Sequence, residues 1–256
     1  MIKFFRGIRQ QLVMENKTSK YLKYAIGEIL LVVIGILIAL QINNWNEDRK
    51  LRNTEHYYLK ELKSEFKKNL KEINKVMARN NANLENALLL ANYLASDSIT
   101  LSNYDFDKHL FKSIVTEIQY RPSPGTLNEI LNSGKLEIIS NKTLRTKLSS
   151  WEAVLLKVRF QELEHATPRL KLLDLTYAQG NFREGYAATT NKTLDLKPRS
   201  SSIHNKKVFR TDQEFDNLMS VFYLSGQALN NNYYEELKEK IEGILELVDS
   251  ELKIYD

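Results

Sequence analysis

Two places in the sequence hold residues that could do chemistry. Glu28 stands inside an apolar run, where a carboxylate can hold an ion, exchange a proton or bond a neighbouring helix. Glu162 and His165 have the i, i+3 spacing seen on the helices of di-iron carboxylate proteins. Such a site also needs a second Glu-x-x-His motif, and the sequence has none. We therefore expect Glu162 and His165 to form an ordinary pair on the protein surface.

The other motifs that mark enzymes are absent from the sequence. Without cysteine there is no disulfide and no thiol chemistry, and the four histidines include no H-x-x-x-H pair for zinc. The chain has no G-x-S-x-G turn, no P-loop and no dinucleotide-binding glycine motif. We expect no catalytic, cofactor-binding or metal-binding residues and hence no enzyme, although a site built from distant residues would leave no motif.

The composition favours helices as the elements that position these residues. Four prolines and nine glycines are too few for a fold with many strands and turns. The predicted class is all-α: an N-terminal interfacial helix, one transmembrane helix that continues into a long stalk helix, and an extracytoplasmic antiparallel helical bundle.

Glu28 belongs to a segment that is long enough to cross a membrane. Residues 24–42 are almost entirely apolar, and at about 1.5 Å per residue they span about 28 Å, close to the hydrocarbon thickness of a bilayer. Their aliphatic side chains favour insertion by more than one off-centre glutamate opposes it. A cleaved signal peptide is the alternative, but residues 38–43 have no A-x-A cleavage site. We expect an uncleaved anchor.

The charge distribution predicts the orientation of this anchor. Residues 1–23 carry six basic residues and one acid, and basic flanks stay in the cytoplasm. Lys23 and Trp45 mark the two membrane boundaries, so that residues 43–256 lie outside the cytoplasm. After residue 23 there are 31 basic and 31 acidic residues, and a neutral outer domain argues against nucleic-acid binding.

The segment before the span has the pattern of a helix that lies on the bilayer surface. Phe4, Phe5, Ile8 and Leu12 recur at near-helical spacing, with basic residues on the other faces. Contact with acyl chains and anionic headgroups would hold this cytoplasmic segment, residues 1–23, on the inner leaflet. A specific cytoplasmic partner is the alternative.

One face of the span is small and polar. A rotation of about 100° per residue places Tyr24, Glu28, Val32, Gly35 and Ala39 on one stripe, which we call the membrane stripe. Small residues permit close helix packing, so the stripe predicts a helix–helix contact in a homo-oligomer or a membrane protein complex. Glu28 would snorkel toward the headgroups, hydrogen-bond the neighbouring helix or couple to an ion.

Two parts of the sequence resemble a known family. The opening MIKFFRGIRQQL and the segment KYLKYAIGEILLVVIGILIALQINNWNEDRK are similar to an uncharacterised family of single-pass membrane proteins abundant in Bacteroidota, a domain of unknown function. The segment RPSPGTLNEILNSGKLEIISNKTLR resembles a later region of that family. The resemblance implies a bacterial inner membrane and a periplasmic domain over residues 43–256, and it brings no activity.

The periplasmic domain is predicted to consist of long helices. Residues 43–95 continue the span as a stalk helix with coiled-coil-like spacing, and a shorter helix covers residues 105–119. Thr126 begins the next segment with Glu129 at capping-box spacing. Asn141 begins another long helix, and a final amphipathic helix has its weakest point at residues 230–232. The expected buried face of the helix after Asn141 is Leu144, Leu148, Trp151, Leu155, Val158, Leu163 and Leu170.

Residues 179–211 are predicted to form a long basic loop. Its cations are Arg183, Lys192, Lys197, Arg199, Lys206, Lys207 and Arg210. A loop of this length in a compact domain usually has a function, and its charge would suit an anionic envelope polymer or an acidic protein partner. A solvated, flexible loop is the alternative.

These features predict a non-enzymatic, oligomeric scaffold or accessory subunit, anchored in the inner membrane, whose periplasmic domain binds an envelope partner. An ion-coupled subunit of an envelope motor or transport complex, using Glu28, is the first alternative. A sensor ectodomain is the second, but the cytoplasmic segment is too short for an output domain.

Overall fold

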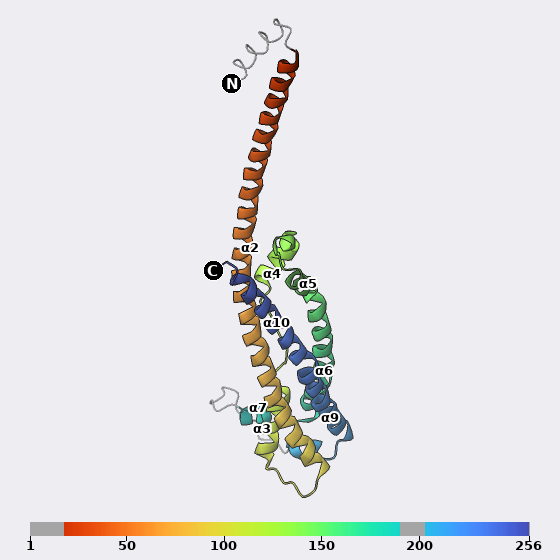
Figure 1. Ribbon diagram of the computed structural model, residues 1–256. Helices are drawn as coiled ribbons and strands as arrows, with labels where there is room; N and C mark the ends of the chain where they lie inside the picture. Colours follow the sequence, from red (N-terminus) through yellow and green to blue (C-terminus); the bar gives the residue numbers. More distant parts are fainter. Residues whose placement is uncertain (1–17, 190–202, 256) are drawn as a thin grey trace. The chain divides into compact units, whose positions relative to one another are not determined.

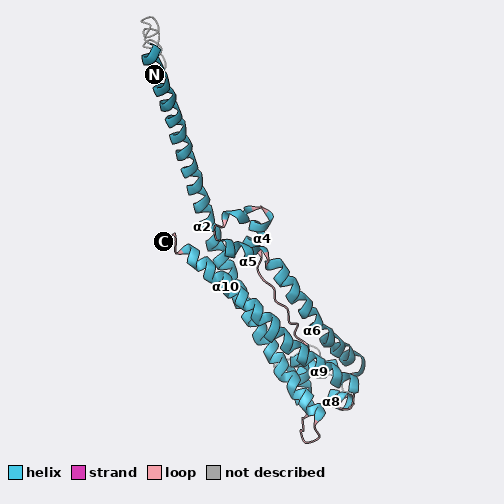
Figure 2. Ribbon diagram, turned by 45° about the vertical axis from the view of Figure 1, so that its right-hand side comes forward, coloured by secondary structure: helices cyan, strands magenta, loops and turns pink. Residues whose placement is uncertain are grey.

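The structure is a computed structural model that describes residues 18–189 and 203–255. Side chains are described throughout these ranges except at residues 18–21 and 24. The described residues form helices and no strands, which confirms the all-α class for this part of the chain (Figures 1 and 2). Most of the expected interfacial helix lies outside the described residues.

The helices follow one another along two compact units, Met1–His56 and Tyr57–Asp256. In order they are α2 (Thr18–Ala95), α3 (Asn103–Ile114), α4 (Gly125–Asn132), the 3-10 helix η1 (Lys135–Ile138), α5 (Lys142–Ser149), α6 (Trp151–Gln179), α7 (Phe182–Thr189), α8 (Asn205–Phe209), α9 (Gln213–Ala228), the π-helix η2 (Leu229–Tyr234) and α10 (Glu235–Leu252).

The first unit contains the apolar part of α2. All leucine, isoleucine and valine side chains from Ile29 to Ile42 are exposed in the single chain. This helix is long and apolar enough to cross a membrane, by its length and composition. Exposed apolar side chains on every face of a helix are stable in lipid and unfavourable in water, so α2 is compatible with a membrane anchor.

Helix α2 is continuous because nothing in its sequence interrupts it. No proline occurs in it, and no glycine occurs in it after Gly35. The helix ends at Ala95, where the Ser96 and Ser98 hydroxyls lie 2.7 Å apart and the Ser98 N–H donates to Ser96 Oγ. Serine hydroxyls compete with helical backbone bonds in this way. The predicted continuous helix to Ala95 is confirmed.

The second unit packs around two apolar clusters that share α2. The first joins the Tyr58–Val76 part of α2 to α4, α5, the start of α6, η2 and α10, with Phe66 edge-on to Trp151 at 5.1 Å between ring centroids. The second joins residues 87–93 of α2 to α3, the end of α6, α8 and α9, with Phe209 stacked on Phe215 at 4.4 Å. Long segments of α2, α6, α9 and α10 lie side by side in this unit (Figures 1 and 2).

Helix α4 is capped from another helix, and the expected cap at Thr126 is wrong. The helix begins at Gly125 without a side-chain cap from its own N-cap residue, Pro124. The carboxylate of Glu65, on α2, instead accepts the backbone N–H of Thr126 at 2.5 Å and that of Leu127 at 3.4 Å. Glu129 accepts the hydroxyl of Tyr58 at 2.7 Å. A long-range carboxylate satisfies the helix terminus in place of a local capping box.

The helix expected after Asn141 is two helices. A helix begins at Asn141 as predicted, and the Asn141 side chain caps it by accepting the N–H of Leu144 at 2.9 Å. The chain then breaks at Ser150, which ends α5 and precedes α6. Similarly, α3 ends at Ile114 rather than near Gln119, and the segment that follows it has Ile118 and Tyr120 buried.

The expected buried face of α6 is wrong over its second half. Leu163 and Leu170 are 62% and 49% exposed. Glu162, His165 and Arg169 are buried in their place. The sequence offered only apolar periodicity as a signal for the buried face. Because α6 has apolar residues on two faces, this periodicity selected the solvent-exposed face.

Candidate functional site

The membrane stripe is open in the single chain. Glu28 is half-buried, Val32 and Ala39 are exposed, and a Cβ added at Gly35 would meet nothing within 4 Å. The side chain of Tyr24 is outside the described part. The expected boundary residues Lys23 and Trp45 are both exposed, with Trp45 at 64%. The described stripe therefore presents a surface on which a second helix can pack.

The basic segment is not the irregular loop expected for residues 179–211. Where it is described, most of it is helical, as α7 and α8. Both helices pack against α3, and Gly185 lies so close to the Phe111 ring that a Cβ there would clash with it. Phe182 also contacts Phe111, at 5.1 Å between ring centroids. These apolar contacts fix the segment, and its high content of cations concealed them in the sequence.

Lys206 and Arg210, which were expected to contact a partner, bond within the domain. Lys206 Nζ donates to the Leu101 carbonyl at 2.8 Å. Arg210 donates to the carbonyls of Tyr93 and Ser96 and pairs with Asp97 at 2.8 Å. These bonds satisfy one carbonyl in the last turn of α2 and two in the segment that follows it.

The other cations of the segment divide into two groups. Arg183 and Lys207 are exposed on α7 and α8, where an acidic partner could reach them. Lys192, Lys197 and Arg199 lie outside the described residues. The structure therefore brings no cluster of the seven cations together in its described part.

Glu162 is buried, so the expected surface pair with His165 is wrong. One of its carboxylate oxygens, Oε1, accepts the backbone N–H of Tyr120 and the hydroxyl of Tyr234, both at 2.7 Å. The other oxygen pairs with Arg159 at 2.7 Å. Three donors, one of them charged, compensate the desolvation of this carboxylate. Its arrangement joins α6 to η2 and to the segment after α3.

His165 is also buried but faces a different partner. Its Nδ1 lies 3.0 Å from Ser225 Oγ, and its ring stacks on Phe222 at 4.6 Å between centroids. Burial, together with the nearby charge of Arg169, lowers the pKa of His165 to about 4. A neutral, stacked histidine with a serine on one nitrogen has no carboxylate to orient it as a base. This pair is therefore a structural contact.

Two buried asparagines of α2 also join it to other segments. Asn80 Nδ2 donates to the Gly226 carbonyl at 3.0 Å and to Asn230 Oδ1 at 2.9 Å. Asn69 pairs with the backbone of Ser123 through both of its amide atoms. In residues 18–189 and 203–255 no group of three His, Cys, Asp or Glu side chains could hold a metal ion. The buried polar network is suited to fixing the bundle.

These network residues were missed in the sequence, although one signal was present. Asn80 lies seven residues after Ile73 and four before Leu84, at a core position of the α2 pattern. An asparagine at a core position of a helical repeat is typical of a specific buried contact. Such a position is a better guide to buried polar groups than motif searches are.

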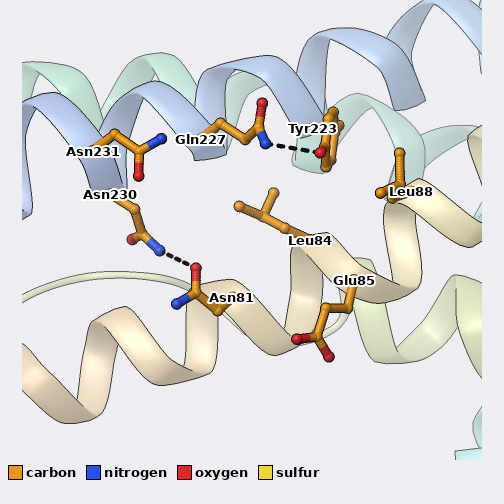
Figure 3. A pocket seen from close by; sticks show the side chains of 8 residues that line it. All are labelled: Asn81, Leu84, Glu85, Leu88, Tyr223, Gln227, Asn230 and Asn231. Carbon is orange, nitrogen blue, oxygen red and sulfur yellow. Dashed lines mark hydrogen bonds between the residues drawn. The ribbon is translucent and has the colours of Figure 1, made fainter.

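An open cleft of about 230 Å³ lies between α2 and the α9–η2 segment (Figure 3). Its rim is unusually rich in side-chain amides. Within it, Gln227 donates to the Tyr223 hydroxyl at 2.8 Å and Asn230 donates to Asn81 Oδ1 at 2.6 Å. The lining residues are Asn81, Leu84, Glu85, Leu88, Tyr223, Gln227, Asn230 and Asn231.

The cleft lies where the final amphipathic helix was expected to be weakest. Residues 230–232 fall within the π-helix η2, and π-helical turns inside α-helices are frequent at functional sites. The amides and a hydroxyl offer both donors and acceptors, and the exposed Glu85 carboxylate adds one negative charge. The cleft can hydrogen-bond a neutral polar group of a partner but has no nucleophile–base pair.

Comparison with known proteins identifies a family and no function. A family model described as a family of unknown function, DUF6090, matches residues 28–227. No curated protein and no solved structure matches the chain.

Proposed function

The chain belongs to a family of unknown function, DUF6090, and from its residues we propose that it is a non-enzymatic, membrane-anchored scaffold or accessory subunit. It assembles as an oligomer in a bacterial inner membrane, with its N-terminus in the cytoplasm. Its periplasmic helical domain, which includes the second unit, binds an envelope partner. The observation that carries the proposal is the open membrane stripe on the apolar part of α2.

The distribution of polar groups in the second unit supports binding rather than catalysis. Glu162, Asn80 and Asn69 bond to backbone groups or side chains of other segments and hold the domain together. Exposed hydrogen-bonding groups instead gather at the amide-rich cleft, where Gln227 and Asn231 reach the surface. This cleft and the exposed cations Arg183 and Lys207 are the surfaces that we assign to the envelope partner.

Cysteine crosslinking in membranes tests the oligomer, because the chain has no cysteine of its own. Val32→Cys, on the membrane stripe, should form disulfide-linked dimers on mild oxidation. Leu37→Cys is a matched control, since both residues are more than half exposed and Leu37 lies on the opposite helical face. Equal crosslinking at the two positions, or none at either, would remove the basis of the proposal.

A protease-protection experiment tests the orientation. In intact spheroplasts, an external protease should degrade the second unit and leave the N-terminal segment protected. Protection of the second unit until the membrane is permeabilised would contradict the proposed topology.

A second candidate function is ion coupling, and Glu28 is the observation that favours it. A carboxylate in an apolar span is a site for ion or proton transfer. Glu28→Gln keeps a hydrogen-bonding side chain and removes the charge. If Glu28→Gln abolishes a proton-driven process while Val32→Cys still forms disulfide-linked dimers, ion coupling is favoured. If Glu28→Gln leaves that process intact, or abolishes the Val32→Cys dimers, Glu28 has a structural role.

A further inference from the structure

Helix α6 buries several polar side chains among its core residues and exposes a row of large apolar ones. Its inward face carries buried Glu162, His165 and Arg169. Its outward face carries apolar side chains that are 49–66% exposed. Figures 1 and 2 show α6 along an edge of the second unit. The exposed apolar residues, which we call the α6 stripe, are Leu156, Phe160, Leu163, Leu170 and Tyr177.

The spacing of the α6 stripe is that of a coiled-coil seam. Leu156, Leu163, Leu170 and Tyr177 recur every seven residues and would occupy position d of a heptad repeat. Phe160 then occupies position a. A strict seven-residue repeat of apolar side chains is the pattern by which one helix packs against another along its length. The spacing therefore indicates a helical occupant.

The exposed area of the stripe is large enough for a stable contact. Five large side chains, each about half to two-thirds exposed, present about 600 Å² of surface. This equals the largest apolar patches on typical monomers and approaches the roughly 800 Å² that one partner contributes to a standard interface. Apolar surface of this size is unfavourable in water and is typical of an interaction site.

The charges beside the stripe match a second copy of the same helix. In a parallel, in-register pair, position g of one helix faces position e of the next heptad on the other. Glu152 then faces Lys157 of the second copy, and Arg159 faces Glu164 of the second copy. Within one chain Lys157 also pairs with Glu236 and Arg159 with Glu162, so each cation would be shared between an internal carboxylate and one of the second copy. Both pairs between the copies are of opposite sign, and each occurs twice because the contact is symmetric.

An antiparallel pair fits the charges less well. When two antiparallel copies align along the whole stripe, position e of one helix faces position e of the other. Lys157 then faces Lys171 of the second copy, and Glu164 faces Glu164 of the second copy. These contacts are between like charges. The charge pattern therefore selects the parallel arrangement, which also suits two copies anchored in one membrane.

We propose that the α6 stripe binds the α6 stripe of a second copy of this chain, as a parallel, in-register helix pair. The inference rests on the proposed oligomeric function and assigns it a contact outside the membrane. Asp174 occupies the last a position, where two carboxylates would meet. This repulsion limits the tightly packed part of the seam to Leu156–Leu170.

Single cysteines in the full-length chain, in membranes, test the contact. Leu156→Cys and Leu163→Cys each place a thiol at a d position, which faces its own copy in a parallel pair. Leu224→Cys on α9 is the matched control, because Leu224 is 62% exposed and the two test residues are 63% and 62% exposed. We expect dimers at both test positions, about fivefold above the control under mild oxidation.

A charge variant tests the register. In the Leu163→Cys chain, Glu152→Lys together with Glu164→Lys converts both facing pairs into like charges, and crosslinking should fall about fivefold. Neither glutamate is buried, so the change leaves the fold intact. Crosslinking that the charge variant does not change would overturn the proposed register.

The same set of variants separates this inference from the proposed function. If Val32→Cys forms dimers while Leu156→Cys and Leu163→Cys stay at the control level, the oligomer stands and the α6 contact is wrong. If none of the three forms dimers, both are wrong. Dimers at Leu163 without dimers at Leu156 overturn the parallel arrangement, because only an in-register pair brings both d positions together.

Discussion

The hydroxyl of Tyr234 donates to Glu162 Oε1 at 2.7 Å, which links the π-helix η2 to the middle of α6. The same oxygen accepts the N–H of Tyr120. Burial and the adjacent carboxylate raise the pKa of the Tyr234 phenol, so the phenol stays protonated and remains a donor at any ordinary pH. This bond is a permanent structural link rather than a proton relay.

Removal of this link should lower stability. Tyr234→Phe deletes one donor to a buried carboxylate and leaves the ring in place, so we expect a loss of about 2 kcal/mol in the free energy of unfolding. Denaturant unfolding of the full chain in detergent, followed by circular dichroism, measures it. Tyr104→Phe, on an exposed tyrosine of α3, should change stability by less than about 0.5 kcal/mol. Equal effects of the two changes would contradict the role of Glu162.

His165 should make the second unit sensitive to acid. Its pKa is about 4 in the folded chain and about 6.5 when unfolded, so the unfolded chain binds more protons between these values. The stability from neutral His165 is complete above about pH 6.5 and is lost as the pH falls toward 4, by about 3 kcal/mol. His165→Gln should reduce this slope in unfolding experiments at pH 7, 6 and 5. An unchanged slope would contradict the assignment.

Asp107 should have the opposite effect on stability as the pH falls. Burial raises its pKa to about 6, so the folded chain binds more protons than the unfolded chain between about pH 4 and 6. The cost of its buried charge is therefore relieved as the pH falls, which offsets part of the loss at His165. Asp107→Asn keeps an oxygen that accepts from Asn205 and removes the charge.

Asp107→Asn should thus raise stability at pH 7 by about 1 kcal/mol or more and steepen the loss on acidification. Unfolding midpoints at pH 7 and pH 5 measure both effects. A variant that is less stable than the parent chain at pH 7 would show that the carboxylate contributes a favourable contact.

The long-range cap on α4 should also be measurable. Glu65→Ala leaves the N–H groups of Thr126 and Leu127 without their acceptor in a buried position, and we expect a loss of about 2 kcal/mol. Glu65→Gln retains an oxygen acceptor and should lose less. Glu61→Ala, on an exposed position of the same helix, is the control and should have little effect. A loss in Glu61→Ala as large as that in Glu65→Ala would contradict the cap.

The sequence predicted helices best where a single apolar face determines them. The continuous helix to Ala95 and the helix start at Asn141 are confirmed, because each depends on local residues. Thr126 failed as a cap because the acceptor, Glu65, lies 61 residues away in the chain. Leu163 and Leu170 failed as core residues because α6 buries polar side chains that only its tertiary partners satisfy.

The candidate surfaces also differ in how far local sequence predicts them. The membrane stripe follows from helical geometry within one helix, so its residues can be named from the sequence, and its contact with a second helix stays a prediction. The amide-rich cleft needs α2 beside the α9–η2 segment, so residues about 150 positions apart, such as Asn81 and Asn230, meet only after folding. No spacing rule connects them, and only the core position of Asn80 gave a local hint.

Gly185 provides the sharpest test of how the basic segment is held. Helix α7 approaches α3 so closely that a methyl group at Gly185 would overlap the Phe111 ring, which is itself buried in the second apolar cluster. Gly185→Ala should therefore displace α7 and lower stability by about 1–3 kcal/mol, despite the better helix propensity of alanine.

Gly243→Ala is the matched control for this change. Gly243 is also helical, but an added methyl there would make only an ordinary contact, 3.5 Å from Lys147 Nζ. We expect it to raise stability by up to about 1 kcal/mol, because alanine loses less backbone entropy than glycine in a helix. Limited proteolysis should in addition cleave the Gly185→Ala chain near α7 sooner than the Gly243→Ala chain. If both chains resist equally, α7 does not depend on its close contact with Phe111, and the basic segment is held by its other contacts, such as the bonds of Lys206 and Arg210.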